Sequence, residues 1–326
     1  MADIAHNETD RLIVELEKKI RREYEQAARE TEKKLASYLR KFEQKDKIWR
    51  AQVAAGEKTA EAYAKWRTSQ IMVGESWESL KRGLASDLHN ANVLAQELVT
   101  QNLAKVYAEN FNYATYLIEK GGKVNTSFSL YNRDAVNRIL KENPELLPQL
   151  DPEKLKKRIE EGKDLLWQKG QIQSVTLQSI LQGDSIPNMA KRIAETMGVR
   201  NNADAIRYAR TAMTSAQNAG RQDAFERAEQ LGIKLKKQWI ATLDDRTRHE
   251  HRLLDGQIRA VDEPFEVEGE EIMYPGDETA EPYLVYNCRC TMISKVDGWE
   301  DKSGQLRSTK DIGDYDEWKN ERGKAP

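Results

Sequence analysis

Two short blocks of the sequence hold the residue types that could do chemistry. The first, WIATLDDRTRHEHRLLDG (residues 239–256), contains two of the chain's four histidines. The second, YNCRC (residues 286–290), contains both of its cysteines. Acids, arginines, histidines and thiols at this density could build an active site, a metal site or a buried hydrogen-bond network.

The first block predicts a polar stripe on a short helix. We expect this helix over residues 244–254, with Asp244 as its N-cap. Four polar side chains three or four residues apart would then share one face: Asp244, Arg248, His251 and Asp255. Such side chains satisfy one another and nearby carbonyl groups, so the favoured interpretation is a hydrogen-bond network that fixes a small module. A catalytic stripe remains the alternative.

The second block raises the question of a metal. Cys288 and Cys290 would face the same side of an extended segment, and His251 with one aspartate could complete four zinc ligands. His249 and His251 lack the four-residue spacing of metalloprotease histidines, and Cys-Arg-Cys does not match the zinc deaminase motif. We therefore expect no cofactor and keep two alternatives, zinc at His251, Cys288 and Cys290, or a Cys–His nucleophile pair.

Composition bounds the class of protein. The chain has 326 residues, of which 33% are charged, and no apolar run of the length that a transmembrane helix needs. A bond between two cysteines two residues apart would be strained, so reduced thiols and a cytosolic origin are expected. Residues 239–326 hold 12 Lys and Arg against 21 Asp and Glu, whereas the remainder is net positive. This balance does not favour a dedicated nucleic-acid binder.

The long elements predict a mainly helical α+β fold. Residues 1–127 show apolar stripes at four-residue steps, which indicate two long helices that form a hairpin or arm, with a break at Gly56 and an end at Gly121 and Gly122. Residues 128–232 predict a helical middle region, in which one helix stops at Gly198 and the next has a smooth face that includes Gly220.

The C-terminal part has a different texture. Residues 233–296 begin with an alternating strand, IKLKKQWIATL, and continue with short strands and prolines, which indicates a small α+β module. Residues 297–326 are polar and are expected to form a loosely held tail.

Four blocks in order, WIATLDDRTRHEHRLLDG, PFEV, YPGD and NCRC, resemble the C-terminal module of phage Mu F-like minor head proteins, also called phage head morphogenesis proteins. Upstream segments such as ARTAMTSAQNAGRQDAFERAEQLGI extend the resemblance to residues 129–296. The positions that match the family pattern are Asp244, Arg246, Arg248, His251, Asp255, Gly256, Pro275, Gly276, Asp277, Asn287, Cys288, Arg289 and Cys290.

The resemblance implies a capsid accessory protein rather than an enzyme. Members of this family associate with the portal protein during head assembly and are packaged inside the virion, so the expected locations are the capsid interior and the host cytoplasm during assembly. Capsid or scaffold proteins and non-specific double-stranded DNA are further implied partners, and no membrane is. The alternative is a hydrolase-like or toxin-like enzyme whose site would combine His251, Asp244 and the pair Cys288 and Cys290.

Overall fold

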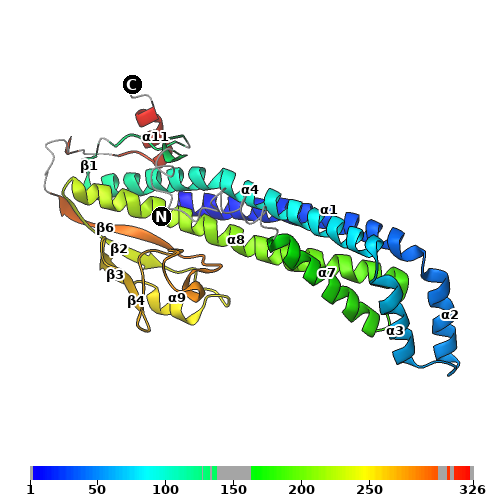
Figure 1. Ribbon diagram of the computed structural model, residues 1–326. Coiled ribbons are helices and arrows are strands. Elements are labelled where there is room, and N and C mark those ends of the chain that lie inside the picture. Colours follow the sequence, from blue (N-terminus) through cyan, green and yellow to red (C-terminus); the bar gives the residue numbers. More distant parts are fainter. Residues whose placement is uncertain are drawn as a thin grey trace. The chain divides into compact units, whose positions relative to one another are not determined.

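The computed structural model describes residues 3–126, 128–132, 134–137, 163–299, 307–308 and 312–323. It is mainly helical with small sheets (Figure 1), so the predicted α+β class is confirmed. The chain divides into two compact units. Unit 1 comprises Met1–Leu16, Leu98–Gln149 and Arg207–Pro326, and unit 2 comprises Glu17–Glu97 and Leu150–Ile206. Among the helices of the described residues, none is long and apolar enough to cross a membrane.

Four helices occupy the N-terminal part: α1 (Ile4–Arg40), α2 (Glu43–Ala54), α3 (Ala60–Ile71) and α4 (Glu75–Gly122). The predicted break at Gly56 is confirmed, because this residue has a φ of +76° between α2 and α3. The first long helix was expected to continue to that point, which is wrong. It stops at Arg40, and the ring of Phe42 turns onto Tyr38 with centroids 5.7 Å apart.

The predicted end of the second long helix at Gly121 and Gly122 is confirmed, since α4 ends at Gly122, but the glycine cap expected there is wrong. Gly121 and Gly122 lie inside α4, and the left-handed residue is Lys123, with a φ of 52°. A Cβ on Gly121 or Gly122 would lie 3.5 or 3.4 Å from the Val296 side chain. These are ordinary contact distances, so Val296 of the neighbouring strand packs against the end of the helix without requiring glycine there.

Unit 2 is built around one apolar cluster contributed by several helices. It includes Leu39, Trp77 and Leu88 together with residues of α7 (Lys163–Leu181) and of α8 (Ile186–Gln230). Helix α8 continues through Gly198, so the predicted stop there is wrong. A Cβ at Gly198 would lie 3.1 Å from the Cβ of Ala28, which makes this glycine a site of close packing. The helix start predicted near Pro152 lies outside the described residues.

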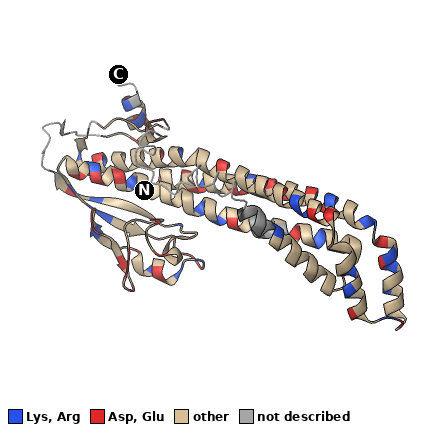
Figure 2. Cartoon of the chain, viewed as in Figure 1, with Lys and Arg blue, Asp and Glu red and all other residues tan. Residues whose placement is uncertain are grey.

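Charged residues of both signs are interspersed along the long helices, as Figure 2 shows. In the basic run at residues 18–22, the Lys and Arg side chains are exposed while Ile20 is buried. This is the pattern of a solvated helix face.

The C-terminal module of unit 1 is a three-stranded antiparallel sheet in the order β3-β2-β6, with a separate hairpin of β4 and β5. Its elements are β2 (Ile233–Ile240), α9 (His249–Leu254), β3 (Ile258–Ala260), β4 (Phe265–Val267), β5 (Glu270–Ile272), α10 (Pro282–Val285) and β6 (Thr291–Trp299). The predicted strand at residues 233–240 is thus confirmed. An apolar cluster that includes Phe225, Leu235 and Met292 packs the sheet against α8 (Figure 1).

The described part of the C-terminal segment is docked rather than loose. Strand β7 (Arg307–Ser308) pairs with β1 (Val124–Asn125), and α11 (Tyr315–Gly323) follows. Tyr315 and Trp318 are buried, and the Trp318 indole donates to Glu119 on α4 at 2.7 Å. The expectation of a loosely held tail is therefore wrong, because two aromatic residues three positions apart give α11 an apolar face.

Strand β2 carries one lysine on its buried side. The Lys237 side chain donates to the Met273 carbonyl at 2.9 Å, and burial lowers its pKa from 10.5 to about 8. Between these two pH values the unfolded chain holds a proton that the folded chain has released, so stability rises with pH in that window. We expect the wild type to gain about 2–3 kcal/mol relative to Lys237→Met between pH 7 and 10. Denaturant unfolding of both proteins measures this, and parallel pH profiles would contradict it.

Candidate functional site

A polar row on α8 anchors the cysteine block. Thr214 donates to the Cys288 carbonyl at 2.8 Å, and the Asn218 amide donates to the carbonyls of Pro275 and Cys290 at 2.9 and 3.2 Å. The backbone N–H of Asn287 donates to the Thr211 hydroxyl at 3.2 Å. Since one helix holds both loops of the module through their backbones, the cysteines have a fixed platform.

The same row ends in a buried arginine. Arg221 is 1% exposed and binds both carboxylate oxygens of Asp3 at 2.7 Å. It also donates to Asn110 at 3.0 Å and to the Met292 carbonyl at 2.9 Å. Burial raises the pKa of Asp3, but the charge and hydrogen bonds of Arg221 outweigh it and leave that pKa below its ordinary value. Arg221 thereby ties Asp3, which directly precedes α1, to α4, α8 and β6.

The two sequence blocks meet at His251, which is buried on α9. Its Nδ1 lies 3.2 Å from the Cys290 Sγ and 3.7 Å from the Cys288 Sγ. Its Nε2 lies 2.9 Å from the Leu284 carbonyl, to which only an N–H can donate. This bond leaves the lone pair of Nδ1 directed at the two sulfurs. The Trp239 ring packs edge-on against the imidazole, with centroids 6.0 Å apart.

The two thiols differ in acidity. A hydrogen bond from the Cys288 thiol lowers the pKa of Cys290 to about 5, although burial acts in the opposite direction. Burial raises the pKa of Cys288 well above its ordinary value. The two pKa shifts therefore have opposite directions, with Cys288 as the donor and Cys290 as the acceptor of the hydrogen bond between the sulfurs.

The predicted stripe on a helix over residues 244–254 is wrong, because α9 begins at His249 with Arg248 in extended conformation before it. Asp244 instead lies in a turn, where it accepts from the backbone N–H of Arg246 at 2.9 Å. Both guanidinium ends of Arg289 donate to Asp244 at 2.6 Å, and this pairing lowers the pKa of Asp244 well below its ordinary range. The acid thus joins the two blocks across space, not along one helix face.

The other arginines have separate partners. Arg248 donates to the Tyr286 carbonyl at 2.7 Å, and another of its nitrogens lies 3.1 Å from His251 Nε2. The Arg246 side chain is 76% exposed and approaches Asp244 at 3.9 Å. Asp255 does not contact His251 in the described structure; it accepts from the backbone N–H of Ala241 at 2.8 Å.

The remaining family-pattern positions shape turns. Gly256 and Gly276 have φ values of 77° and 86°, which favour glycine. A Cβ on Gly276 would lie 2.9 Å from the backbone nitrogen of Ser215, so this turn can touch α8 only without a side chain. Asp277 closes the turn by accepting from Met273 and Thr279, each at 3.0 Å.

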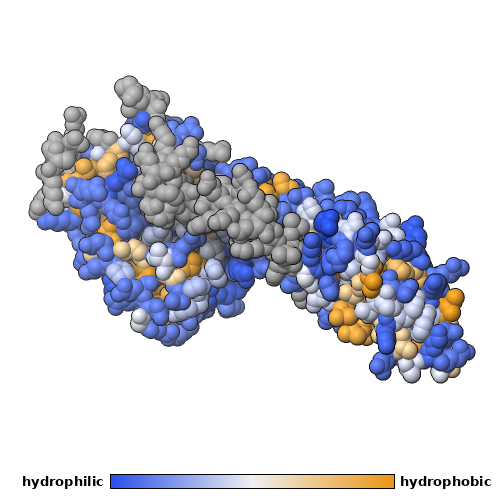
Figure 3. All heavy atoms as spheres, in the orientation of Figure 1, coloured by the Kyte–Doolittle hydropathy of each residue, from blue (hydrophilic) through white to orange (hydrophobic). Residues whose placement is uncertain are grey.

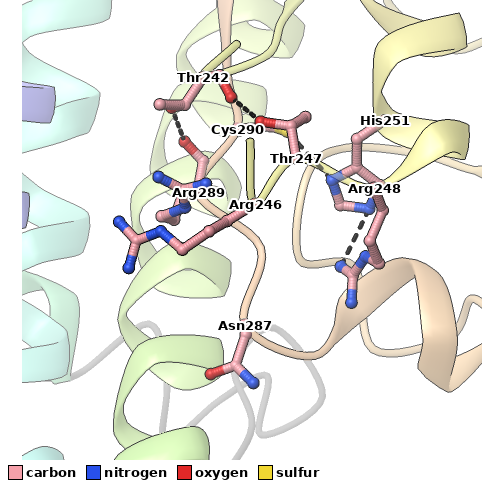
Figure 4. A pocket seen from close by; sticks show the side chains of 8 residues that line it. All are labelled: Thr242, Arg246, Thr247, Arg248, His251, Asn287, Arg289 and Cys290. Carbon is pink, nitrogen blue, oxygen red and sulfur yellow. Dashed lines mark hydrogen bonds between the residues drawn. The ribbon is translucent and has the colours of Figure 1, made fainter. Parts of the chain in front are cut away.

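A pocket of about 90 Å³ opens beside the histidine and the cysteines. Figure 4 shows its side chains: a guanidinium nitrogen of Arg248 lies beside His251 Nε2, and the Thr242 hydroxyl donates to the Arg289 carbonyl. The residues that line it are Thr242, Arg246, Thr247, Arg248, His251, Asn287, Arg289 and Cys290. A space this small accommodates water or a small ion. Its size does not favour an enzyme that binds a large substrate at the Cys–His pair.

Sequence reasoning missed the α8 side chains that hold this region. Thr211, Thr214, Asn218 and Arg221 are spaced by three, four and three residues, which places them on one helix face. This polar row within a helix otherwise rich in small residues was the signal that could have revealed them.

Comparison with known proteins places this region in a family. Residues 170–293 match the family described as phage Mu protein F like protein. The minor head protein GP7 of Bacillus phage SPP1 is 28% identical over 290 residues, which cover 87% of each chain. No solved structure matches.

Two further relatives are longer proteins that this chain matches only in part. The NAD(+)–arginine ADP-ribosyltransferase EFV of Enterococcus faecalis is 29% identical over 218 residues, or 66% of this chain. An uncharacterized protein of Haemophilus influenzae is 32% identical over 129 residues. The present chain spans only 43% of the Enterococcus protein and 25% of the Haemophilus protein, so most of each lies outside the match.

Proposed function

Because this chain is a phage head protein of the Mu F-like family, we propose that it acts as a minor head protein that binds the portal during head assembly and is packaged in the virion. The observation that carries the proposal is the similarity to a minor head protein over 87% of both chains. Shared length on this scale covers the helical parts as well as the C-terminal module. The proposal therefore concerns the whole chain.

Unit 2 offers a surface for the portal. Ile48, Val73, Leu177 and Leu181 are exposed large hydrophobic residues, which we call the apolar end of unit 2. They lie on α2, on the α3–α4 connection and on α7, and α3 contacts both α2 and α7. Figure 3 shows orange patches in this part of the molecule. Exposed apolar side chains grouped on helices are typical of protein interaction sites.

DNA is the second partner in this proposal. Residues 239–326 carry an excess of acidic residues, so any contact with packaged DNA would use the remainder of the chain, which is net positive. Such contact would be independent of sequence and would weaken steeply with salt.

We expect the double variant Ile48→Glu and Val73→Glu to lose co-purification with the cognate portal protein, because two charges would enter an apolar contact. The measurement is affinity purification of tagged portal co-expressed with each full-length chain. Leu243→Glu, at a comparably exposed leucine of unit 1, is the matched control and should bind as the wild type does. Retention of binding by the double variant would rule out the apolar end of unit 2 as the portal site.

Deletion of residues 1–120 would not be an equivalent test of where the portal protein binds. It would remove Asp3 and most of α4, on which Arg221 and the packing of unit 1 depend. A loss of binding by the shortened chain would then reflect unfolding.

A further inference from the structure

We propose that His251, Cys288 and Cys290 form a binding site for a zinc ion, whose fourth ligand is a water molecule or small anion from the adjoining pocket. This goes beyond the proposed function, and the two can fail separately. The three ligand atoms lie within 4.8 Å of one another, and all three residues are buried. Two sulfurs and one imidazole nitrogen are a donor set that zinc prefers.

The spacing of the donors fits tetrahedral zinc. Zinc–sulfur bonds of about 2.3 Å and zinc–nitrogen bonds of about 2.0–2.1 Å imply a nitrogen–sulfur separation of about 3.6 Å. The observed separations from His251 Nδ1 are 3.2 Å to Cys290 and 3.7 Å to Cys288. Shifts of a few tenths of an ångström would therefore suffice to bind the ion.

The surroundings of the donors are also those of a metal site. His251 Nε2 donates to the Leu284 carbonyl, which orients the ring and presents the Nδ1 lone pair to the ion. The backbone N–H of Cys290 donates to the Cys288 sulfur at 3.4 Å, a bond that stabilises a thiolate. Thr214 and Asn218 hold the carbonyls of both cysteines, so the sulfurs are positioned before a metal binds.

The fourth position cannot come from the aspartates that the sequence suggested. Both oxygens of Asp244 are bound by Arg289, and Asp255 accepts from the backbone of Ala241. His251 and Cys290 line the pocket of about 90 Å³, together with Arg246, Arg248 and Arg289. Two thiolates neutralise the charge of zinc, and the arginines favour an anionic group or hydroxide in the remaining position.

Zinc would act here as a staple. It would tie α9 to the segment that leads into β6, in a module that has no disulfide in its described residues. Small modules with little apolar core commonly use a metal in this way.

The test uses full-length protein purified under reducing conditions. We expect one zinc per chain by elemental analysis after equilibration with zinc and gel filtration. Replacement by cobalt should give the visible absorption of tetrahedral cobalt and a near-ultraviolet sulfur-to-cobalt band. Because the chain has only two cysteines, that band reports on Cys288 and Cys290 alone.

Variants assign the ligands. His251→Asn, Cys288→Ser and Cys290→Ser should each lower metal content at least tenfold, whereas His249→Asn should keep it. His249 is the matched control, because it lies on the same helix with a side chain that is 70% exposed. Should a ligand variant fail to fold, the wild-type cobalt spectrum still decides. Absence of the sulfur-to-cobalt band, or equal loss of metal in His249→Asn, would overturn the proposal, while portal binding by a metal-free wild type would leave the proposed function intact.

Discussion

Replacement of Arg221 with alanine should lower the free energy of unfolding by about 3–5 kcal/mol, the range expected when one partner of a buried ion pair is removed. The substitution leaves the Asp3 carboxylate without the cation that binds both its oxygens. It also leaves the Asn110 side chain and the Met292 carbonyl without their donor. Denaturant unfolding of the full-length chain, followed by circular dichroism, measures the effect.

Lys191→Ala is the control for this substitution. Lys191 also lies on α8 and pairs with Glu195 at 3.8 Å, but both side chains are more than 60% exposed. An exposed pair of this kind contributes about 0–1 kcal/mol. Equal losses in the two variants would contradict the claim that Arg221 joins the N-terminal residues to the C-terminal module.

Gly220→Ala should destabilise the chain by about 3 kcal/mol, at the upper end of the range for overpacking a well-packed interior. A Cβ at this position would lie 2.4 Å from the Tyr107 carbonyl oxygen on α4. The clash is with backbone, so a rotamer change cannot relieve it and the two helices must separate. The measurement is the midpoint of denaturant unfolding together with its slope.

Gly83→Ala is the matched control, and we expect it to change the stability of the folded chain in the opposite direction. Gly83 also lies within a long helix, but among the described residues no atom beyond its chain neighbours and its own helix backbone would lie within 4 Å of its added Cβ. Replacing a glycine there should stabilise the helix by up to about 1 kcal/mol. If Gly220→Ala is as stable as Gly83→Ala, the close approach of α4 and α8 is wrong.

The local sequence pattern predicted the fold class. It also predicted those helices and strands whose formation depends on residues close together in the sequence. The alternation of IKLKKQWI sets the buried face of β2, and Gly56 ends a helix because its φ of +76° suits glycine. The helix end predicted at Gly198 was wrong. In the sequence, a glycine that ends a helix cannot be distinguished from a glycine that permits close packing against another helix. Only the contact with Ala28 distinguishes the two cases.

The sequence indicated which residues form the site better than it indicated which of them contact each other. The meeting of His251 with Cys288 and Cys290 follows from two blocks that share one small module. Arg289 as the partner of Asp244 could not be predicted, because the helix that would have joined Asp244 to Arg248 does not form. Thr214 and Asn218 were missed since they lie some 70 residues before the cysteines they hold. A fragment of residues 239–296 would lack Thr214 and Asn218, and with them the hydrogen bonds that hold the cysteine segment.

Binding of the full-length wild-type chain to its cognate portal protein tests the central assignment most directly. The two proteins are purified separately, mixed and resolved by size-exclusion chromatography, with the multimeric portal in the early fraction. We expect the chain to shift into the portal fraction, and we expect this shift to persist at a salt concentration that abolishes DNA contacts. Elution of the chain at its own position, at concentrations well above those of head assembly, would contradict it.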